Sequence, residues 1–131
     1  VSVLSRNRDT KIMGVIGVGE LAEMVRECPE KVIIVDVRQH DYTDGKLKGS
    51  INIPFDRFPE PAITLLCEMV NSTKPKVIVT HCHYCQTRGP KSARMLVESG
   101  RFEVPIVYLE GGWDAWYNRF HADPDMIEAL Q

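Results

Sequence analysis

Short apolar runs rich in valine and isoleucine alternate along this chain with segments of helical spacing, and that alternation limits the fold to one class. The runs cover residues 32–35, 77–79 and 106–109. Continuous β-branched runs of this length predict strands that are buried on both faces, as in parallel sheets. Because helical segments separate them, the sequence predicts an α/β fold with a mostly parallel sheet.

The other elements are predicted from helical spacing, prolines and turn residues. The polar residues 1–11 show no period and predict a loose lead-in, which leaves residues 12–131 as one domain. Residues 51–54 predict a short strand that ends at a proline, and Asp123-Pro124 predicts the start of a last short helix. Longer helices are expected over residues 17–28, 61–70, 90–99 and 113–120.

Composition excludes several classes of protein. The chain has 131 residues, and 16 Lys and Arg against 18 Asp and Glu give a formal net charge of −2, whereas most nucleic-acid binders are strongly basic. No apolar run approaches the roughly 20 residues that cross a bilayer. The four cysteines are too few and too unevenly placed for a secreted disulfide scaffold. We therefore expect a protein of the cytoplasm, with the nucleus as the alternative, that binds neither nucleic acid nor membrane. A monomer is also expected, although composition does not determine the oligomeric state.

The segment from His81 to Pro90 reads His-Cys-His-Tyr-Cys-Gln-Thr-Arg-Gly-Pro and lies between a predicted strand and a predicted helix. Open α/β sheets bind ligands at this end of their strands. Cys82 is a candidate nucleophile, because the N-terminus of the following helix lowers the pKa of a thiol and binds an oxyanion. Arg88 presents a planar fork of donors that fits a tetrahedral oxyanion. The alternative is that Cys82 is a small buried apolar residue.

This segment resembles the signature loop of the Cdc25-class phosphatases and of the eukaryotic arsenate reductases, which share the rhodanese-like fold. Three further stretches extend the resemblance over nearly the whole chain. Residues 35–38 match the Asp-x-Arg strand end of rhodanese-like domains, residues 40–54 match the family stretch that runs from Glu-x-Tyr to Asn-Ile-Pro, and residues 108–113 match a Gly-Gly-aromatic turn. The resemblance implies a single rhodanese-like catalytic domain, with helices that flank a mostly parallel central sheet.

The length of the loop separates the branches of this family. Sulfurtransferases of this fold carry a shorter loop than the seven residues from Cys82 through Arg88, so the resemblance favours the phosphatase and reductase branch. It implies a phosphatase of the protein tyrosine or dual-specificity type, in which Cys82 forms a thiophosphate while Arg88 and the loop amides hold the phosphoryl oxygens. The implied substrate is a phosphorylated protein or a small oxyanion. The amides belong to His83, Tyr84, Cys85, Gln86 and Thr87.

Arsenate or antimonate reduction is the nearest alternative function. The same Cys82 and Arg88 would serve it, with an external thiol such as glutathione or glutaredoxin as the reductant. No metal or other cofactor is implied, and Cys28 and Cys67 lack the partner spacing of a zinc site. Sulfur transfer from thiosulfate, an inactive rhodanese-like binding module and a thioredoxin-like oxidoreductase are further alternatives.

The loop departs from the Cdc25 pattern in its proton donor and in its second cysteine. Glutamates that have been considered as acids in that loop are replaced here by His83 and Thr87. His83 is therefore a candidate general acid, and a solvated histidine is the alternative. Cys85 is a candidate redox partner, because a Cys-x-x-Cys pair can form a reversible disulfide; the alternative is a small side chain that fills the loop. The other candidate acids are Asp41, Asp44 and Glu110.

The remaining polar and aromatic residues are interpreted mainly as structural. Asp36 and Arg38 are expected to fix the end of a strand and its neighbouring loops, and His81 is expected to orient the catalytic loop. Lys91 and Arg94 add positive potential near an anion or lie on a solvated helix face. One apolar helix face, from which Trp113 could reach the rim of the site, is expected from Trp113, Trp116, Tyr117 and Phe120.

Overall fold

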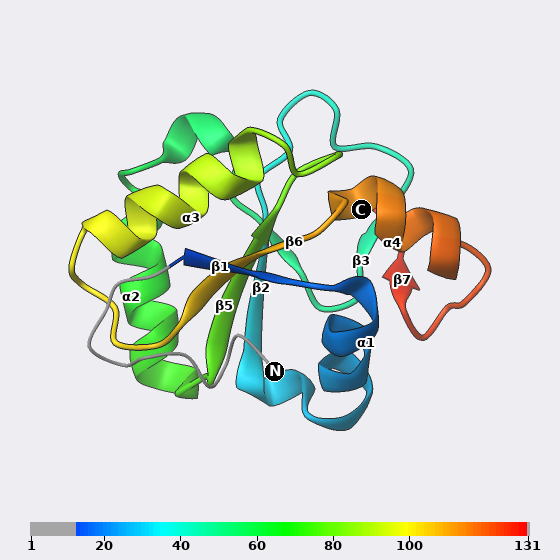
Figure 1. The fold of residues 1–131 in the computed structure, drawn as a ribbon, viewed down its shortest axis with the longest axis horizontal. Coiled ribbons are helices and arrows are strands. Elements are labelled where there is room, and N and C mark those ends of the chain that lie inside the picture. The colour runs from blue at the N-terminus through cyan, green and yellow to red at the C-terminus, as the bar shows by residue number, and fades with distance from the viewer. Residues whose placement is uncertain (1–12, 131) are drawn as a thin grey trace.

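The computed structural model describes residues 13–130, so the predicted lead-in over residues 1–11 lies outside them. Five strands form the central sheet: β1 (Met13–Ile16), β2 (Val32–Asp36), β4 (Ile51–Asn52), β5 (Val77–His81) and β6 (Ile106–Leu109). Their order across the sheet is β1-β6-β5-β2-β4, and every neighbouring pair is parallel (Figure 1). The predicted parallel sheet is therefore confirmed.

Two pairs of helices cover the two faces of the sheet, as Figure 1 shows. On one face lie α1 (Val18–Glu27) and α4 (Gly112–Phe120), and on the other lie α2 (Ala62–Thr73) and α3 (Arg88–Glu98). All four predicted longer helices are present. Their ends differ by up to three residues from the predicted ones, because caps and tertiary contacts decide where a helix ends.

Side chains along the central strands alternate between two hydrophobic cores. In β2, Ile34 joins the core under α1 and α4, whereas Ile33 and Val35 join the core under α2 and α3. Complete burial of such a side chain contributes about 1.5–3 kcal/mol. A strand with a core on each side is therefore stabilised by a continuous apolar run, which is the pattern that the sequence shows.

Three strands of the structure are absent from the sequence prediction. No strand is predicted at β1, whose four residues include a glycine that weakens the pattern. The predicted helix at Asp123-Pro124 is wrong: the chain turns there and then forms β7 (Ile127–Glu128), which pairs antiparallel with β3 (Lys46–Leu47). The carbonyl oxygen of Met126 accepts the indole N–H of Trp116 at 2.9 Å. The N–H groups of Met126 and Ile127 still donate to the carbonyl oxygen of Asp123, but this turn is not extended into a helix because the next residues pair with β3.

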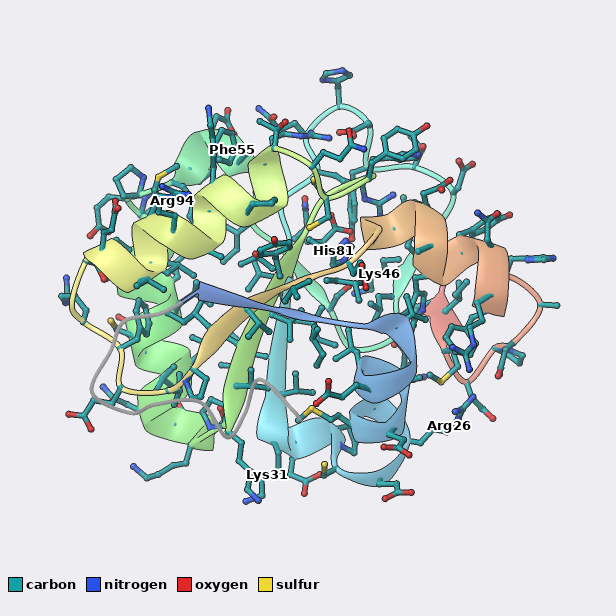
Figure 2. The ribbon with its side chains drawn as sticks, viewed as in Figure 1. Arg26, Lys31, Lys46, Phe55, His81 and Arg94 are labelled. Carbon is teal, nitrogen blue, oxygen red and sulfur yellow. The ribbon has the colours of Figure 1, made fainter. Side chains whose placement is uncertain are left out.

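The carboxyl ends of β2, β5 and β6 lie at one edge of the sheet, beside the N-termini of α3 and α4 (Figure 1). In Figure 2, His81 lies inside the molecule near this edge, whereas Lys31 points outward at the opposite end. Loops far apart in the sequence therefore meet at this edge. Two 3₁₀ helices, η2 (Pro29–Lys31) and η3 (Phe55–Arg57), lie in connecting segments. Among the described residues, no helix is long and apolar enough to cross a membrane.

Candidate active site

The segment predicted to carry the chemistry connects β5 to α3. β5 ends at His81, residues 82–87 form an irregular loop, and α3 begins at Arg88. Pro90 lies in the first turn of α3, where its missing N–H removes no helical hydrogen bond. The structure thus places Cys82 and Arg88 at the two ends of one loop, at the carboxyl edge of the sheet.

Cys82 lies beneath the start of α3, with only 3% of its surface exposed. The backbone N–H of Gly89 donates to Cys82 Sγ at 3.3 Å. The pKa of Cys82 falls to about 5, because the Cys85 thiol and two backbone N–H groups donate to its sulfur and Arg88 adds positive charge, which together outweigh burial. At neutral pH Cys82 is therefore a thiolate, the nucleophilic form.

Cys85 has the opposite ionisation. It is buried, and its φ of 59° turns the loop at this position. Its pKa is raised far above the usual range by its hydrogen bond to Cys82, by burial and by the charge of the thiolate. Cys85 therefore stays a thiol, whose proton has two acceptors: the Cys82 thiolate and the carbonyl oxygen of Thr80, which lies 4.0 Å from Cys85 Sγ. The loop thus holds one thiolate beside one thiol.

Two glycines leave the space that this loop needs. A Cβ at Gly89 would overlap the sulfur of Cys85, and a Cβ at Gly112 would lie 2.5 Å from the carbonyl oxygen of Cys82. Gly112 also has a φ of 59°, which other residues rarely adopt. In the sequence, both glycines are recognised only as parts of larger motifs. Their close approach to the loop gives a physical reason for the Gly-Pro and Gly-Gly pairs.

The first turn of α4 fixes the orientation of the loop peptides. Trp113 N–H donates to the carbonyl oxygen of Cys82 at 2.9 Å, and Asp114 N–H donates to that of His83 at 2.8 Å. In a trans peptide the C=O and the next N–H point in opposite directions. The N–H groups of His83 and Tyr84 therefore point away from α4, an arrangement that leaves one side of the loop lined with donors.

Arg88 is paired with a carboxylate from the loop after β2. Its Nη1–H donates to Asp41 Oδ1 at 2.9 Å, and its Nη2–H donates to Asp41 Oδ2. The two side chains are 24% and 28% exposed, respectively. The hydrogen bond from Arg88 holds the pKa of Asp41 well below its usual range, and the same contact raises the pKa of Arg88. Both groups are therefore charged. This pair is not predicted from the sequence, in which Asp41 is only one of the candidate acids.

The other candidate acids occupy different surroundings. The ring of His83 packs edge-to-face against Tyr84, with the centroids 4.4 Å apart. Asp44 is exposed and accepts a hydrogen bond from a neighbouring threonine hydroxyl at 3.5 Å. Glu110 is exposed just after β6. Within residues 13–130, no group of three or more His, Cys, Asp or Glu side chains is arranged to hold a metal ion.

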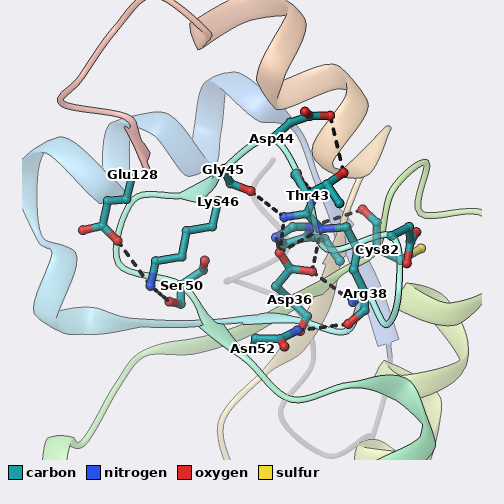
Figure 3. Close-up of polar contacts among 12 residues, drawn as sticks. Asp36, Arg38, Thr43, Asp44, Gly45, Lys46, Ser50, Asn52, Cys82 and Glu128 are labelled. Atoms are coloured by element: carbon teal, nitrogen blue, oxygen red, sulfur yellow. Dashed lines mark hydrogen bonds and ion pairs between the residues drawn. The ribbon is translucent and has the colours of Figure 1, made fainter. Parts of the chain in front are cut away.

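Asp36 and Arg38 form a buried ion pair that braces the neighbouring loop, as predicted (Figure 3). The Nη2–H of Arg38 donates to Asp36 Oδ2 at 2.7 Å, and both side chains are fully buried. Further N–H groups of Arg38 donate to the carbonyl oxygens of Thr43 at 3.0 Å and Gly45 at 2.8 Å. The ion pair therefore ties down the loop that carries Asp41.

His81 is fully buried and contacts the loop of residues 82–87 directly. Its Nδ1 lies 3.2 Å from the carbonyl oxygen of Cys82, and its Nε2 lies 3.9 Å from Asp36 Oδ2. This placement agrees with the predicted orienting role. Lys91 and Arg94 are exposed on α3, and Figure 2 shows Arg94 at the outer side of that helix, as expected for a solvated face.

The aromatic face of α4 is only partly as predicted. Trp113, Trp116 and Phe120 are buried, and the guanidinium of Arg38 lies 4.6 Å from the centroid of the Trp113 ring. Trp113 therefore packs inside the domain and does not reach the rim of the site. Tyr117 is 39% exposed and lies at the edge of the predicted apolar face; its ring packs against Trp113 while its polar end can stay in water.

Comparisons with known proteins identify relatives of this chain. Residues 18–119 match the model of the rhodanese-like domain family. The dual specificity phosphatase ibp1 of Schizosaccharomyces pombe is 32% identical over 122 residues, which cover 78% of this chain and 86% of that protein. M-phase inducer phosphatase 2 of Mus musculus is 30% identical over 98 residues, which cover 67% of this chain and 17% of that protein.

A solved structure gives the same result. The As-Sb reductase from Leishmania major superposes with a TM-score of 0.80 at 25% identity, and the match covers 92% of this chain and 88% of that one. The homologues thus include phosphatases and a reductase, as the signature loop predicts. Because the family model matches most of the length of this chain, the chain belongs to the rhodanese-like domain family.

Proposed function

We propose that this chain is a Cys-dependent phosphatase of the protein tyrosine or dual-specificity type. The observation that carries the proposal is the Cys82 thiolate at the start of α3, which accepts Gly89 N–H at 3.3 Å and shares one loop with Arg88. A thiolate, a helix N-terminus and an arginine are the groups that attack a phosphoryl centre and bind its oxygens. The similarity to a dual specificity phosphatase supports the same reaction.

The reaction proceeds in two steps. In the first, Cys82 Sγ bonds to phosphorus, and the bond to the leaving oxygen breaks with its electron pair. Arg88 and the loop N–H groups bind the equatorial oxygens most strongly as charge accumulates there. In the second step, water attacks phosphorus and the P–S bond breaks, which regenerates the thiolate. The proposed substrate is a phosphorylated protein side chain, by similarity to the phosphatase relatives.

Hydrolysis of 4-nitrophenyl phosphate by the reduced protein tests this proposal. We expect turnover to disappear in Cys82→Ser. Cys67→Ser is the matched control, because Cys67 is a half-buried cysteine on α2, outside the loop, and turnover is expected to persist there. A wild-type rate no higher than that of Cys82→Ser would overturn the phosphatase function.

Arsenate or antimonate reduction is a second candidate, which the Cys85 thiol beside Cys82 and the likeness to an As-Sb reductase favour. Cys82 Sγ would bond to arsenic and displace water. A second thiol would then attack Cys82 Sγ, so that arsenic(V) leaves as arsenic(III) and the two sulfurs form a disulfide. Cys85 or an external thiol such as glutathione, with glutaredoxin, supplies that second sulfur. Arsenite formation from arsenate and glutathione measures the reaction, and a yield equal to that of Cys82→Ser would exclude it.

A further inference from the structure

The proposed phosphatase reaction needs a proton donor, and the catalytic loop contains no carboxyl group that could serve as one. A poor leaving group has to be protonated as its bond to phosphorus breaks. Residues 82–88 are Cys-His-Tyr-Cys-Gln-Thr-Arg and contain neither Asp nor Glu. A carboxylic acid for this step therefore has to come from another segment that reaches the loop.

Asp41 is the candidate carboxylate that reaches it. Asp41 Oδ1 accepts Nη1–H of Arg88 at 2.9 Å, and its Oδ2 accepts Nη2–H, so both terminal nitrogens of the guanidinium face this carboxylate. Asp44 instead accepts a bond from an exposed threonine, and the ring of His83 packs against a tyrosine. Asp41 and Arg88 are both partly exposed, so a substrate can approach them from solvent.

The ion pair conflicts with the binding of an oxyanion. In the free protein, the charges of Cys82, Arg88 and Asp41 add up to one negative charge at the loop. A phosphate dianion needs the same guanidinium N–H groups, and it repels an ionised carboxylate beside it. If the oxyanion replaces the carboxylate, the hydrogen bond that holds the pKa of Asp41 low is lost, and the negative charge of the bound oxyanion raises this pKa further, which favours the protonated form.

We propose that the incoming oxyanion displaces Asp41 from Arg88 and that the displaced, protonated Asp41 is the proton donor to the leaving oxygen. This inference rests on the proposed phosphatase function. As Cys82 Sγ bonds to phosphorus, the leaving oxygen keeps the electron pair of the broken bond and receives the proton of Asp41. In the second step, the Asp41 carboxylate takes a proton from the attacking water. When phosphate leaves, Asp41 returns this proton to solvent and pairs with Arg88 again.

The test compares two esters that differ in their leaving group: 4-nitrophenyl phosphate, whose leaving group needs no proton, and phenyl phosphate, whose leaving group does. We expect Asp41→Asn to lower kcat/KM for phenyl phosphate by about 10²–10⁴-fold, and that for 4-nitrophenyl phosphate by less than about tenfold. Asp41→Glu keeps a carboxyl group and is expected to restore part of the loss. Asp44→Asn, in the same loop, is the matched control and is expected to change neither rate.

Every other pattern overturns the proposal. Equal losses on both esters would mean that Asp41 only positions Arg88, equal gains would mean that it only competes with the substrate, and unchanged rates would leave it no role. Wild-type protein that hydrolyses neither ester would overturn the phosphatase function itself, whereas the variant patterns, measured in an active protein, concern Asp41 alone.

Inorganic phosphate, used as a competitive inhibitor, tests the displacement step separately. Asp41→Asn is expected to lower the inhibition constant of phosphate, because the anion no longer has to displace a carboxylate. A raised constant would contradict the exchange. Thermal unfolding of each variant checks the fold. If Asp41→Asn does not fold, the two esters are compared in Asp41→Glu, which is the smaller change.

Discussion

Gly112 lies so close to the catalytic loop that a Cβ at this position would be 2.5 Å from the carbonyl oxygen of Cys82. Gly112→Ala is therefore expected to push the loop out of place and to lower kcat/KM by about 100-fold, since small misplacements of reacting groups have effects of this size. Gly49→Ala is the matched control, because Gly49 also has a positive φ but its Cβ would meet nothing within 4 Å. Both variants are expected to lose about 1–2 kcal/mol of unfolding free energy from backbone strain. Full activity in Gly112→Ala would show that the close approach does not position the loop.

The hydrogen bond from the Cys85 thiol is the largest cause of the low pKa of Cys82, which is about 5. The rate of alkylation by iodoacetamide is expected to rise with pH through this value and then to level off, because only the thiolate reacts. Cys85→Ala removes the donor and is expected to move the midpoint to higher pH, whereas the hydroxyl of Cys85→Ser can still donate and is expected to move it less. Absorbance of the thiolate near 240 nm gives the same titration. Identical midpoints in the wild type and Cys85→Ala would contradict the assigned cause.

Cys82 and Cys85 are expected to form a reversible disulfide under mild oxidation. Hydrogen peroxide converts the Cys82 thiolate to a sulfenic acid and releases water or hydroxide, and condensation with the Cys85 thiol then releases a second water. Mass spectrometry of the treated protein should show the linked peptide, and dithiothreitol should restore the thiols. In Cys85→Ser the sulfenic acid has no such partner, so irreversible oxidation of Cys82 should accumulate. Equal recovery of free Cys82 in both proteins would exclude a protective role for Cys85.

Arg38 carries a buried charge whose partners are Asp36 and two loop carbonyl oxygens. Arg38→Met leaves the carboxylate of Asp36 buried without this partner, so the unfolding free energy is expected to fall by about 3–5 kcal/mol. Arg101→Met is the matched control, because Arg101 lies 4.0 Å from Glu60 and both side chains are more than half exposed. That variant is expected to change stability by less than about 1 kcal/mol. Urea unfolding measures both, and similar values for the two variants would contradict the bracing role of Arg38.

Local sequence patterns are sufficient for four strands of the central sheet (β2, β4, β5 and β6), for the longer helices and for the position of the candidate loop. The apolar run at residues 32–35 predicts a strand that is covered on both faces, because only such a strand buries every side chain of a continuous apolar run. The segment from Cys82 to Arg88 can likewise be recognised from the sequence, because a candidate nucleophile, loop amides and an arginine occupy one short stretch between a strand and a helix. Both predictions use only residues that are close together in the chain.

The tertiary structure decided the contacts between distant segments. Arg88 and Asp41 are 47 positions apart, and nothing in either local pattern distinguishes Asp41 from Asp44. Likewise, the residues after Asp123 form β7 because β3 offers a partner strand, although their own sequence favours a helix. The sequence by itself determined the α/β class and the loop, because period and spacing are local properties. The partners of that loop depend on the order of the parallel strands, which brings loops from remote positions to one edge of the sheet.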